Sequence, residues 1–249
     1  MSLRINKDNL YVMLPSNAYF AESKIDDSLD DDFTLFARVK LNIQSLTAKE
    51  SFIVSRNGMH SGISAFKNFL GKVYVQYTYW CKNPVQDMTF AKQVQYELHN
   101  TEALDFIEVY MANDQKNNKI GCFFNGNLVG SIVYDGLDRI KYENIPYWFG
   151  CGGMFGDESD RCVGDFEFDK VFAIKKKLYS VDIIDILKNY DTLYSSRVYE
   201  TYKGFNKEWE LTKYFAFFCD FNTVNRYKIW NYVFNGNFPQ LYIDGNIYY

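Results

Sequence analysis

The sequence predicts an all-β fold in which two antiparallel sheets stack as a sandwich or jelly roll. The first observation behind this is the aromatic content, because 19% of the 249 residues are Phe, Trp or Tyr and aromatic residues favour strands. The second is that short runs of β-forming residues alternate with Asn, Asp and Gly along most of the chain. Many short strands joined by turn residues are typical of a sandwich, and the length suits one such domain.

The strand pattern occurs in ten segments, namely residues 33–41, 51–55, 62–66, 72–80, 94–98, 105–111, 119–124, 128–134, 147–151 and 165–174. Segment 72–80 alternates most clearly. It places Val73, Val75, Tyr77 and Tyr79 on one face, and Tyr74, Gln76, Thr78 and Trp80 on the other. A tight turn is expected at Asn125-Gly126, because both residues tolerate positive φ.

One helix is expected after the last of these strands. Ser180 is placed to cap a helix over 181–188, and Asp182 lies near the positive end of its dipole. The apolar stripe of this helix consists of Val181, Ile184 and Leu187, widened by Ile183.

The chain is expected to divide near residue 190. Residues 1–190 form the predicted sandwich domain. Residues 191–249 are again rich in aromatic side chains. We interpret them as a C-terminal extension that packs on the sandwich or mediates assembly, and a small separate subdomain is the alternative.

Charge and composition exclude several classes of protein. The 27 basic and 31 acidic residues give a net charge of −4, which argues against a nucleic-acid partner. No apolar run approaches the roughly 18 residues of a membrane span. Residues 1–7 have no apolar core of a signal peptide, so a virion-associated or cytoplasmic location is expected rather than secretion. The five cysteines have no paired Cys-x-x-Cys spacing, so a zinc site is not expected.

Three segments carry a family resemblance. The first is Phe33-Thr-Leu-Phe-Ala-Arg-Val-Lys40 with Phe52-Ile-Val-Ser-Arg-Asn-Gly58, and the second is the hairpin Lys119-Ile-Gly-Cys-Phe-Phe-Asn-Gly-Asn-Leu-Val-Gly-Ser131. The third runs from Phe149-Gly-Cys-Gly-Gly153 to Phe168-Asp-Lys-Val-Phe-Ala-Ile174 and the helix. In this order they resemble the LamG-like group of the concanavalin A-like lectin/glucanase superfamily, over about residues 8–190.

The resemblance implies a concanavalin A-like jelly roll with one concave sheet, and ligands bound on that face or at edge loops. Two positions depart from the family pattern: the glycine near the closing Asp stands earlier, at Gly164, and Ile174 replaces a frequent Tyr. The superfamily includes lectins, adhesion modules, glycanases and lyases, so the fold does not fix the chemistry.

Sugars offer flat C–H faces and many hydroxyls, so their sites combine aromatic rings with polar side chains. Candidate ligand-binding residues are Tyr77, Tyr79 and Trp80, Tyr147 and Trp148, and the loop residues Asp157, Glu158 and Arg161. The alternative is that one face of each strand is core and that the loop is merely solvated.

Two acidic groups suggest further chemistry. Asp157, Glu158 and Asp160 are candidate ligands for calcium, the one cofactor suggested, although a solvated loop is the alternative. Asp165, Glu167 and Asp169 are catalytic candidates, because alternation places them on one face, as a retaining glycosidase requires for its two close carboxyls. However, Asp169-Lys170 resembles a bulge, since Phe168, Val171 and Ala173 form the natural inward set.

The main functional hypothesis is a non-catalytic carbohydrate-binding or adhesion module, whose partner is a glycan or polysaccharide. The alternative is a phage or virus structural protein that decorates a capsid or tail and contacts virion or surface-assembly proteins. A glycoside hydrolase is the third hypothesis, and a recognition domain that acts beside a sugar-processing enzyme is a fourth.

Overall fold

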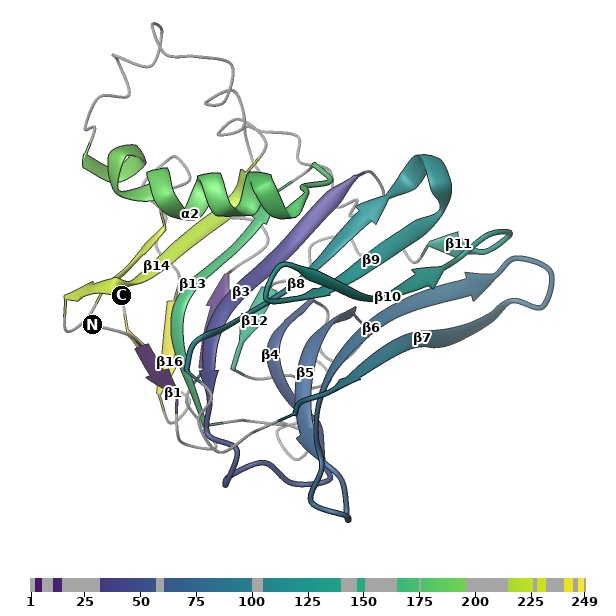
Figure 1. Ribbon diagram of the computed structural model, residues 1–249, viewed down its shortest axis with the longest axis horizontal. Coiled ribbons are helices and arrows are strands. Elements are labelled where there is room, and N and C mark those ends of the chain that lie inside the picture. The colour runs from purple at the N-terminus through teal and green to yellow at the C-terminus, as the bar shows by residue number, and fades with distance from the viewer. Residues whose placement is uncertain are drawn as a thin grey trace, which may run out of the picture.

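The computed structural model (Figure 1) describes residues 3–5, 11–14, 32–56, 61–99, 105–139, 147–150, 165–174, 176–195, 215–225, 228–231, 240–243 and 246–248. These residues form two antiparallel β-sheets and one α-helix. The predicted all-β two-sheet sandwich with one short helix is therefore confirmed.

The first sheet has an antiparallel order that mixes strands from distant parts of the chain. Across the sheet these are β10 (Asn127–Val133), β9 (Lys119–Phe124), β8 (Ile107–Asp114), β3 (Phe33–Leu41), β13 (Phe166–Ile174), β14 (Phe215–Asn225) and β15 (Lys228–Asn231), and β1 (Leu3–Ile5) also pairs with β13. A 3₁₀ turn, η2 (Gln115–Asn117), joins β8 to β9. The C-terminal strand β14 thus continues the sheet directly from β13.

The second sheet is built around the hairpin of β5 and β6. Its strands are β11 (Asp138–Arg139), β6 (Val73–Asn83), β5 (Ser61–Lys67), β4 (Ser51–Arg56), β12 (Tyr147–Phe149), β2 (Tyr11–Leu14), β16 (Gln240–Ile243) and β17 (Asn246–Tyr248), and β7 (Met88–Glu97) pairs with β6. Here too a C-terminal strand, β16, pairs with an N-terminal one, β2. Strands beyond residue 190 therefore pair with both sheets.

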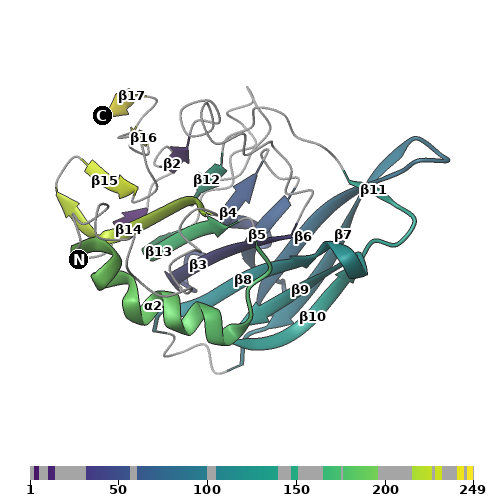
Figure 2. The ribbon, with the colours of Figure 1, turned by 90° about the horizontal axis from the view of Figure 1, so that it is seen from above.

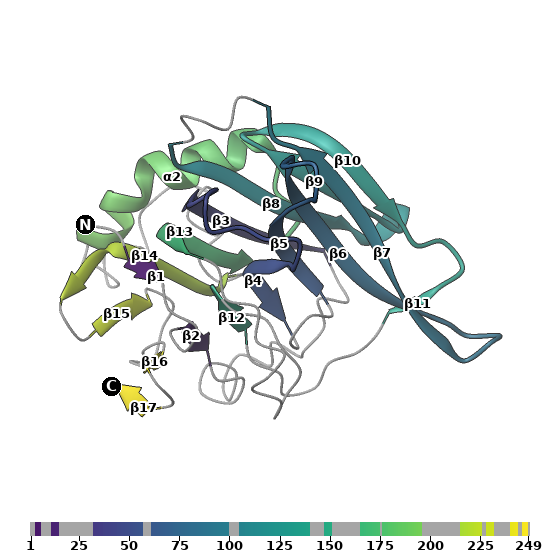
Figure 3. The ribbon, with the colours of Figure 1, turned by 90° about the horizontal axis from the view of Figure 1, so that it is seen from below.

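Some strands have the predicted bounds, and others are longer than predicted because they pair with a neighbouring strand. β9 occupies the predicted 119–124, and its turn has the expected positive φ at Asn125 (47°) and Gly126 (79°). β7 begins at Met88 rather than at the predicted 94, because it pairs with β6 without a break as far as Asn83. The long β6–β7 hairpin consequently projects beyond the rest of the sandwich (Figures 1 and 3).

The main core lies between the two sheets. It includes Phe33, Leu35, Ala37, Val39 and Leu41 of β3, Phe166, Phe168, Val171 and Ala173 of β13, and Val73, Val75, Tyr77, Tyr79 and Cys81 of β6. These positions alternate along each strand, as expected when one face is buried. The face of β6 that carries Tyr77 and Tyr79 is therefore the inner one.

The inward set on β13 depends on a bulge. The register between β13 and β3 shifts between Phe168 and Lys170, and Asp169 is the additional residue. Because of this shift, Val171 and Ala173 reach the same core as Phe168. The predicted bulge at Asp169-Lys170 is confirmed.

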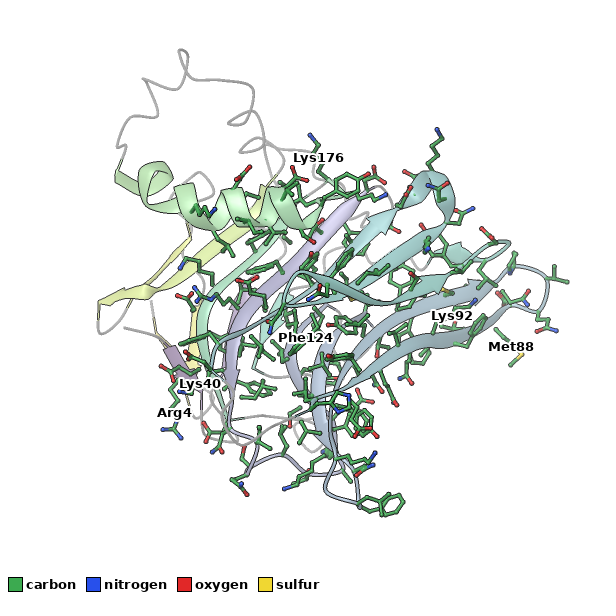
Figure 4. The ribbon with its side chains drawn as sticks, viewed as in Figure 1. Arg4, Lys40, Met88, Lys92, Phe124 and Lys176 are labelled. Carbon is green, nitrogen blue, oxygen red and sulfur yellow. The ribbon has the colours of Figure 1, made fainter. Side chains whose placement is uncertain are left out.

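The sandwich is closed where β7 of one sheet meets β10 of the other. The Nζ atom of Lys92 on β7 donates to the carbonyl oxygen of Val133 on β10 at 2.5 Å, and the ring of Tyr96 packs at a tilt against that of Phe124 at the end of β9, with centroids 4.8 Å apart. Figure 4 labels Lys92 and Phe124. These contacts join β7 of the second sheet to β10 and β9 of the first.

Helix α2 (Ser180–Ser195) covers the outer face of the first sheet (Figure 2). A second apolar cluster fills this layer; it contains Phe36, Tyr110, Phe172, Ile174, Leu178, Ile183 and Ile186, with Phe123 and Leu187 at its margin. Of the predicted stripe, Ile183 and Leu187 pack in this layer, whereas Val181 and Ile184 are 65% and 44% exposed, so that part of the prediction is wrong. Among the described helices none is long and apolar enough to cross a membrane.

The start of α2 differs from the predicted cap. The carbonyl of Tyr179 accepts the first helical bond from Ile183, and the carboxylate of Asp182 accepts from the Tyr179 amide at 2.7 Å. Tyr179 is therefore the N-cap residue, and Asp182 completes half of a capping box. Ser180 instead donates its hydroxyl to the carbonyl of Gly126 at 2.6 Å, which ties the helix to the β9–β10 turn.

Candidate functional site

Tyr77 and Tyr79, which were expected to offer ring faces to a ligand, lie inside the sandwich. Their exposed fractions are 0% and 4%. The Tyr77 hydroxyl donates to the carbonyl of Phe123 at 2.6 Å, and burial raises the pKa of Tyr77 well above its usual value. The ring of Tyr79 packs 5.8 Å from that of Tyr134. The predicted platform of Tyr77 and Tyr79 is therefore wrong, because their alternating face of β6 is the core face.

The opposite face of β6 points away from the core and carries a different set of side chains. Tyr74, Gln76, Thr78 and Trp80 alternate along it, as the sequence pattern predicted. Trp80 is half-buried and is thus the one member of the predicted triplet on this outer face. The three residues Tyr77, Tyr79 and Trp80 do not form one surface.

Polar side chains extend across the outer face from β5 to β7. We call Glu50, Ser64, Gln76, Thr78 and Gln95 the polar row. Ser64, Gln76 and Gln95 are direct cross-strand neighbours on β5, β6 and β7, and Glu50 immediately precedes β4. Neighbours in such positions share one face of a sheet.

The hydrogen bonds that join Gln95, Gln76 and Glu50 all point toward Glu50, and the carboxylate of Glu50 is the final acceptor. Gln95 Nε2 donates to Gln76 Oε1 at 2.6 Å, and Gln76 Nε2 donates to Glu50 Oε1 at 2.6 Å. Ser64 Oγ donates to Glu50 Oε2 at 3.1 Å. An ionised carboxylate can only accept hydrogen bonds, so Glu50 fixes the orientation of both amides. Gln95 is bonded through its nitrogen, and its carbonyl oxygen remains at the end of the chain of bonds.

Burial decreases along the row from β5 to β7. Ser64, Gln76 and Thr78 are 0%, 2% and 3% exposed, whereas Gln95 is exposed. Buried polar groups are costly unless they are hydrogen-bonded. Here Ser64 and Gln76 donate to Glu50, and Gln76 Nε2 also lies 3.4 Å from Thr78 Oγ1 as a donor. Glu50, at the other end of the row, is half-buried. The part of the row that is most open to a ligand from solvent is therefore its β7 end.

Aromatic residues flank the polar row along the strands. Tyr74 stacks on Phe66 with centroids 5.3 Å apart, and its hydroxyl donates to Glu97 Oε2 at 3.2 Å. Lys72 also donates to Glu97, at 3.0 Å, and this hydrogen bond lowers the pKa of the Glu97 carboxyl. Trp80 lies further along β6, on the other side of the row from Tyr74. Half-buried rings beside fixed hydrogen-bonding groups suit a ligand with apolar faces and hydroxyls.

The second predicted aromatic pair belongs to β12. Tyr147 and Trp148 pair through their backbone with β4 and with β2, and Trp148 lies opposite Ser55. Their side chains are outside the described part of the structure. So are Asp157, Glu158, Asp160 and Arg161, and their predicted ligand or calcium contacts stay predictions. Among the residues that are described, no three His, Cys, Asp or Glu side chains form a metal-binding group.

The catalytic candidates on β13 are engaged in contacts that join strands. Asp165 accepts from Arg4 Nη2 at 3.0 Å and from Asn42 Nδ2 at 2.6 Å, and the hydrogen bond from Arg4 lowers the pKa of the Asp165 carboxyl. Asp169 accepts from Arg38 Nη1 at 2.9 Å and is buried. A lowered pKa, as at Asp165, is the reverse of what a catalytic acid needs.

The bulge interrupts the β13–β3 register at the third of these acids. Asp169 occupies the bulge, whereas Glu167 is half-buried and lies opposite Lys40 of β3 and Arg4 of β1 in the register. The structure thus places Asp165, Glu167 and Asp169 among basic residues of β1 and β3.

Sequence reasoning missed Glu50, Gln76 and Gln95 as site residues. The alternation in 72–80 already separated Gln76 from the core face, which was the available signal. The sequence around Glu50 and Gln95 contained no such signal. Their hydrogen bonds to Gln76 depend on the pairing of three strands and on the position of a loop residue.

Comparisons with known proteins give structural neighbours only. No protein-family model matches the chain, and no curated protein matches it. Among solved structures, the CBM40 of the Ruminococcus gnavus IT-sialidase is 15% identical, with 74% of this chain and 95% of that chain covered and a TM-score of 0.50. The binding domain of botulinum neurotoxin DC in complex with SialylT is 13% identical, with a TM-score of 0.48.

The share of each neighbour's own chain that is matched differs between these structures. The match to the neurotoxin domain covers 72% of this chain but only 39% of that chain. A SAP-like pentraxin from Limulus polyphemus is 10% identical, with 73% of this chain and 83% of that chain covered and a TM-score of 0.44. Together with the two-sheet topology, the CBM40 match shows that the chain has the same kind of fold, an antiparallel two-sheet β-sandwich.

Proposed function

We propose that this protein is a carbohydrate-binding module of the LamG-like type, without a catalytic role, and that it recognises a glycan on the outer face of the second sheet. The contact surface is the β7 end of the polar row together with the rings of Tyr74 and Trp80. The observation that carries the proposal is the fixed direction of the hydrogen bonds from Gln95 through Gln76 to Glu50.

The direction of these hydrogen bonds matters because it leaves the side-chain carbonyl oxygen of Gln95 as an acceptor for a ligand. Glu50 orients both amides before any ligand arrives, so Gln95 can offer its carbonyl oxygen to a sugar hydroxyl without an entropic cost of ordering it. Preorganised polar groups of this kind give affinity and specificity. The flanking rings supply the apolar surface on which the C–H face of a sugar packs.

The fold is consistent with this proposal. The CBM40 neighbour is a domain of a sialidase, and the neurotoxin domain was solved in complex with SialylT. These neighbours support a glycan as ligand class but leave its identity open. The alternative role in virion assembly depends on residues 191–249, whose side chains lie outside the described residues.

The test is a screen of the full chain on a glycan array, followed by calorimetric titration with the glycans that bind. Gln95→Ala should weaken binding about five- to tenfold, the value of one hydrogen bond. Trp80→Ala should weaken it at least as much through lost stacking. The matched control is Gln86→Ala, which removes an exposed amide at the β6–β7 turn.

Two results would refute the proposal. One is a folded wild-type chain that binds no glycan on a broad array. The other is glycan binding that Gln95→Ala and Trp80→Ala leave unchanged, because the contact surface would then lie elsewhere.

A further inference from the structure

The turn between β5 and β6 presents two large apolar side chains to solvent. Phe69 is 92% exposed and Leu70 is 68% exposed. The turn has a defined shape, because Asn68 Oδ1 accepts from the amides of Leu70 and Lys72 at 3.0 and 2.9 Å. A backbone bond from Gly71 to Asn68, at 2.9 Å, closes it. We call residues 68–71 the apolar tip.

The chain around the apolar tip is basic, although the whole molecule is acidic. No Asp or Glu occurs between Glu50 and Asp87, and this stretch contains Arg56, Lys67, Lys72 and Lys82. The net charge of the whole chain is −4. Of these four, Lys67 and Lys72 lie next to the tip, whereas Arg56 pairs with Ser61 at the opposite end of β5 and Lys82 pairs with Asp87 at the β6–β7 turn.

Three lysines lie near the apolar tip, and two of them, Lys67 and Lys49, are not paired with a described carboxylate. Lys72 is paired with Glu97 at 2.9 Å. Lys67 and Lys49 have no ion pair within the part of the chain that the structure describes. Lys49 is exposed, and its loop is joined to the end of β5 by a hydrogen bond from the Lys67 amide to the Thr47 carbonyl at 2.7 Å. Both lysines thus lie close behind the apolar tip.

We propose that the apolar tip inserts Phe69 and Leu70 into the surface of a lipid bilayer that contains anionic lipids. The tip is a short turn at the end of the β5–β6 hairpin and not a groove, so it suits a deformable medium that closes around it. Phe and Leu would enter the boundary between headgroups and acyl chains, where apolar residues of peripheral proteins bind. Lys49 and Lys67 would stay at the level of the anionic headgroups.

Such attachment is reversible and sensitive to salt. Two apolar side chains bury less surface than a single acyl chain, which by itself gives only marginal binding. The lysines add an attraction that ions screen within about one Debye length. Binding should therefore require anionic lipid and should fall as the salt concentration rises.

The experiment measures cosedimentation of the full chain with vesicles of phosphatidylcholine, with and without phosphatidylserine. The vesicles contain no carbohydrate, so the result is independent of the proposed glycan site. We expect binding to the anionic vesicles only. The double substitution Phe69→Ser with Leu70→Ser should lower the partition coefficient about tenfold or more, and Lys67→Glu should lower it several-fold.

The matched control is Val85→Ser. Val85 is 91% exposed and lies in the β6–β7 turn next to Lys82 and Asp87, which pair with each other; Figure 4 labels nearby Met88. This substitution should leave vesicle binding unchanged. The proposal is overturned if the folded chain does not bind anionic vesicles, if the tip variant binds like wild type, or if Val85→Ser causes the same loss.

Discussion

At the scale of single residues, Gly130 allows the two sheets to approach each other closely because it has no side chain. A Cβ atom on Gly130 of β10 would lie 2.5 Å from Cγ1 and 3.4 Å from Cγ2 of Val94 on β7. Carbon atoms do not approach to 2.5 Å, and a β-branched side chain such as Val has few alternative rotamers. Gly130 is therefore required for the contact that closes the sandwich.

Gly130→Ala should lower the free energy of unfolding by about 1–3 kcal/mol, as overpacking does in other cores. In a Val94→Ala background the same change should cost less, because the atoms that clash are gone. Urea unfolding of the four variants in this double-mutant cycle measures the difference. Equal costs in both backgrounds would contradict the assigned contact.

Residue-level roles on β6 were predictable only in part. The alternation in 72–80 separated the two faces, but it did not say which face is core. Tyr77 has a polar tip that suits a binding surface, yet its hydroxyl finds a buried carbonyl at Phe123. That partner comes from another strand, so the sequence contained no local sign of it.

At the scale of elements, α2 illustrates a helix whose position is predictable and whose rotation is not. The predicted helix over 181–188 lies within α2, which begins one residue earlier, at Ser180, and ends at Ser195. The inward residues are Ile183, Ile186 and Leu187, because the helix lies on Phe36, Tyr110 and Phe172 of the sheet. A short apolar sequence offers two overlapping stripes, and the shape of the sheet beneath selects one.

This rotation yields a prediction for the helix. Ile186, 7% exposed, should cost about 2–5 kcal/mol of stability when it is replaced by Ala, because a cavity remains against the sheet. Val181→Ala should change the stability by no more than about 0.5 kcal/mol, since Val181 is 65% exposed. Thermal and urea unfolding of the two variants compare them. A loss of stability in Val181→Ala as large as that in Ile186→Ala would contradict this orientation of the helix.

At the scale of the whole molecule, the sandwich was predictable and its strand order was not. Local alternation and turns identify strands, whereas the pairs β13–β14 and β2–β16 join segments far apart in the chain. Nothing in residues 215–225 indicates which strand they accompany. The predicted division at residue 190 stays a prediction.

Asp165 links three such distant segments and makes their association depend on pH. It accepts from Arg4 of β1 and from Asn42 after β3, and the hydrogen bond from Arg4 lowers its pKa in the folded state. A carboxyl with a lowered folded pKa stabilises the protein above its unfolded pKa of about 3.9. That contribution is lost as the pH falls through the folded pKa.

The expected result is that Asp165→Asn lowers the stability at pH 7 and reduces its decline in acid. Urea unfolding at several pH values between neutral and strongly acidic conditions measures both effects. Asp135→Asn, at an exposed turn, is the control. An unchanged pH profile in Asp165→Asn would contradict the role of this ion pair.

The pairing of β13 has a consequence for any shortened form of the protein. One side of this strand is paired with β3, while the other is shared by β1 at residues 166–168 and by β14 at residues 170–174. A fragment that ends before β14 would leave a row of unsatisfied backbone donors and acceptors beside Val171 and Phe172. Such an open strand is a template for pairing with another copy, so the fragment is expected to self-associate.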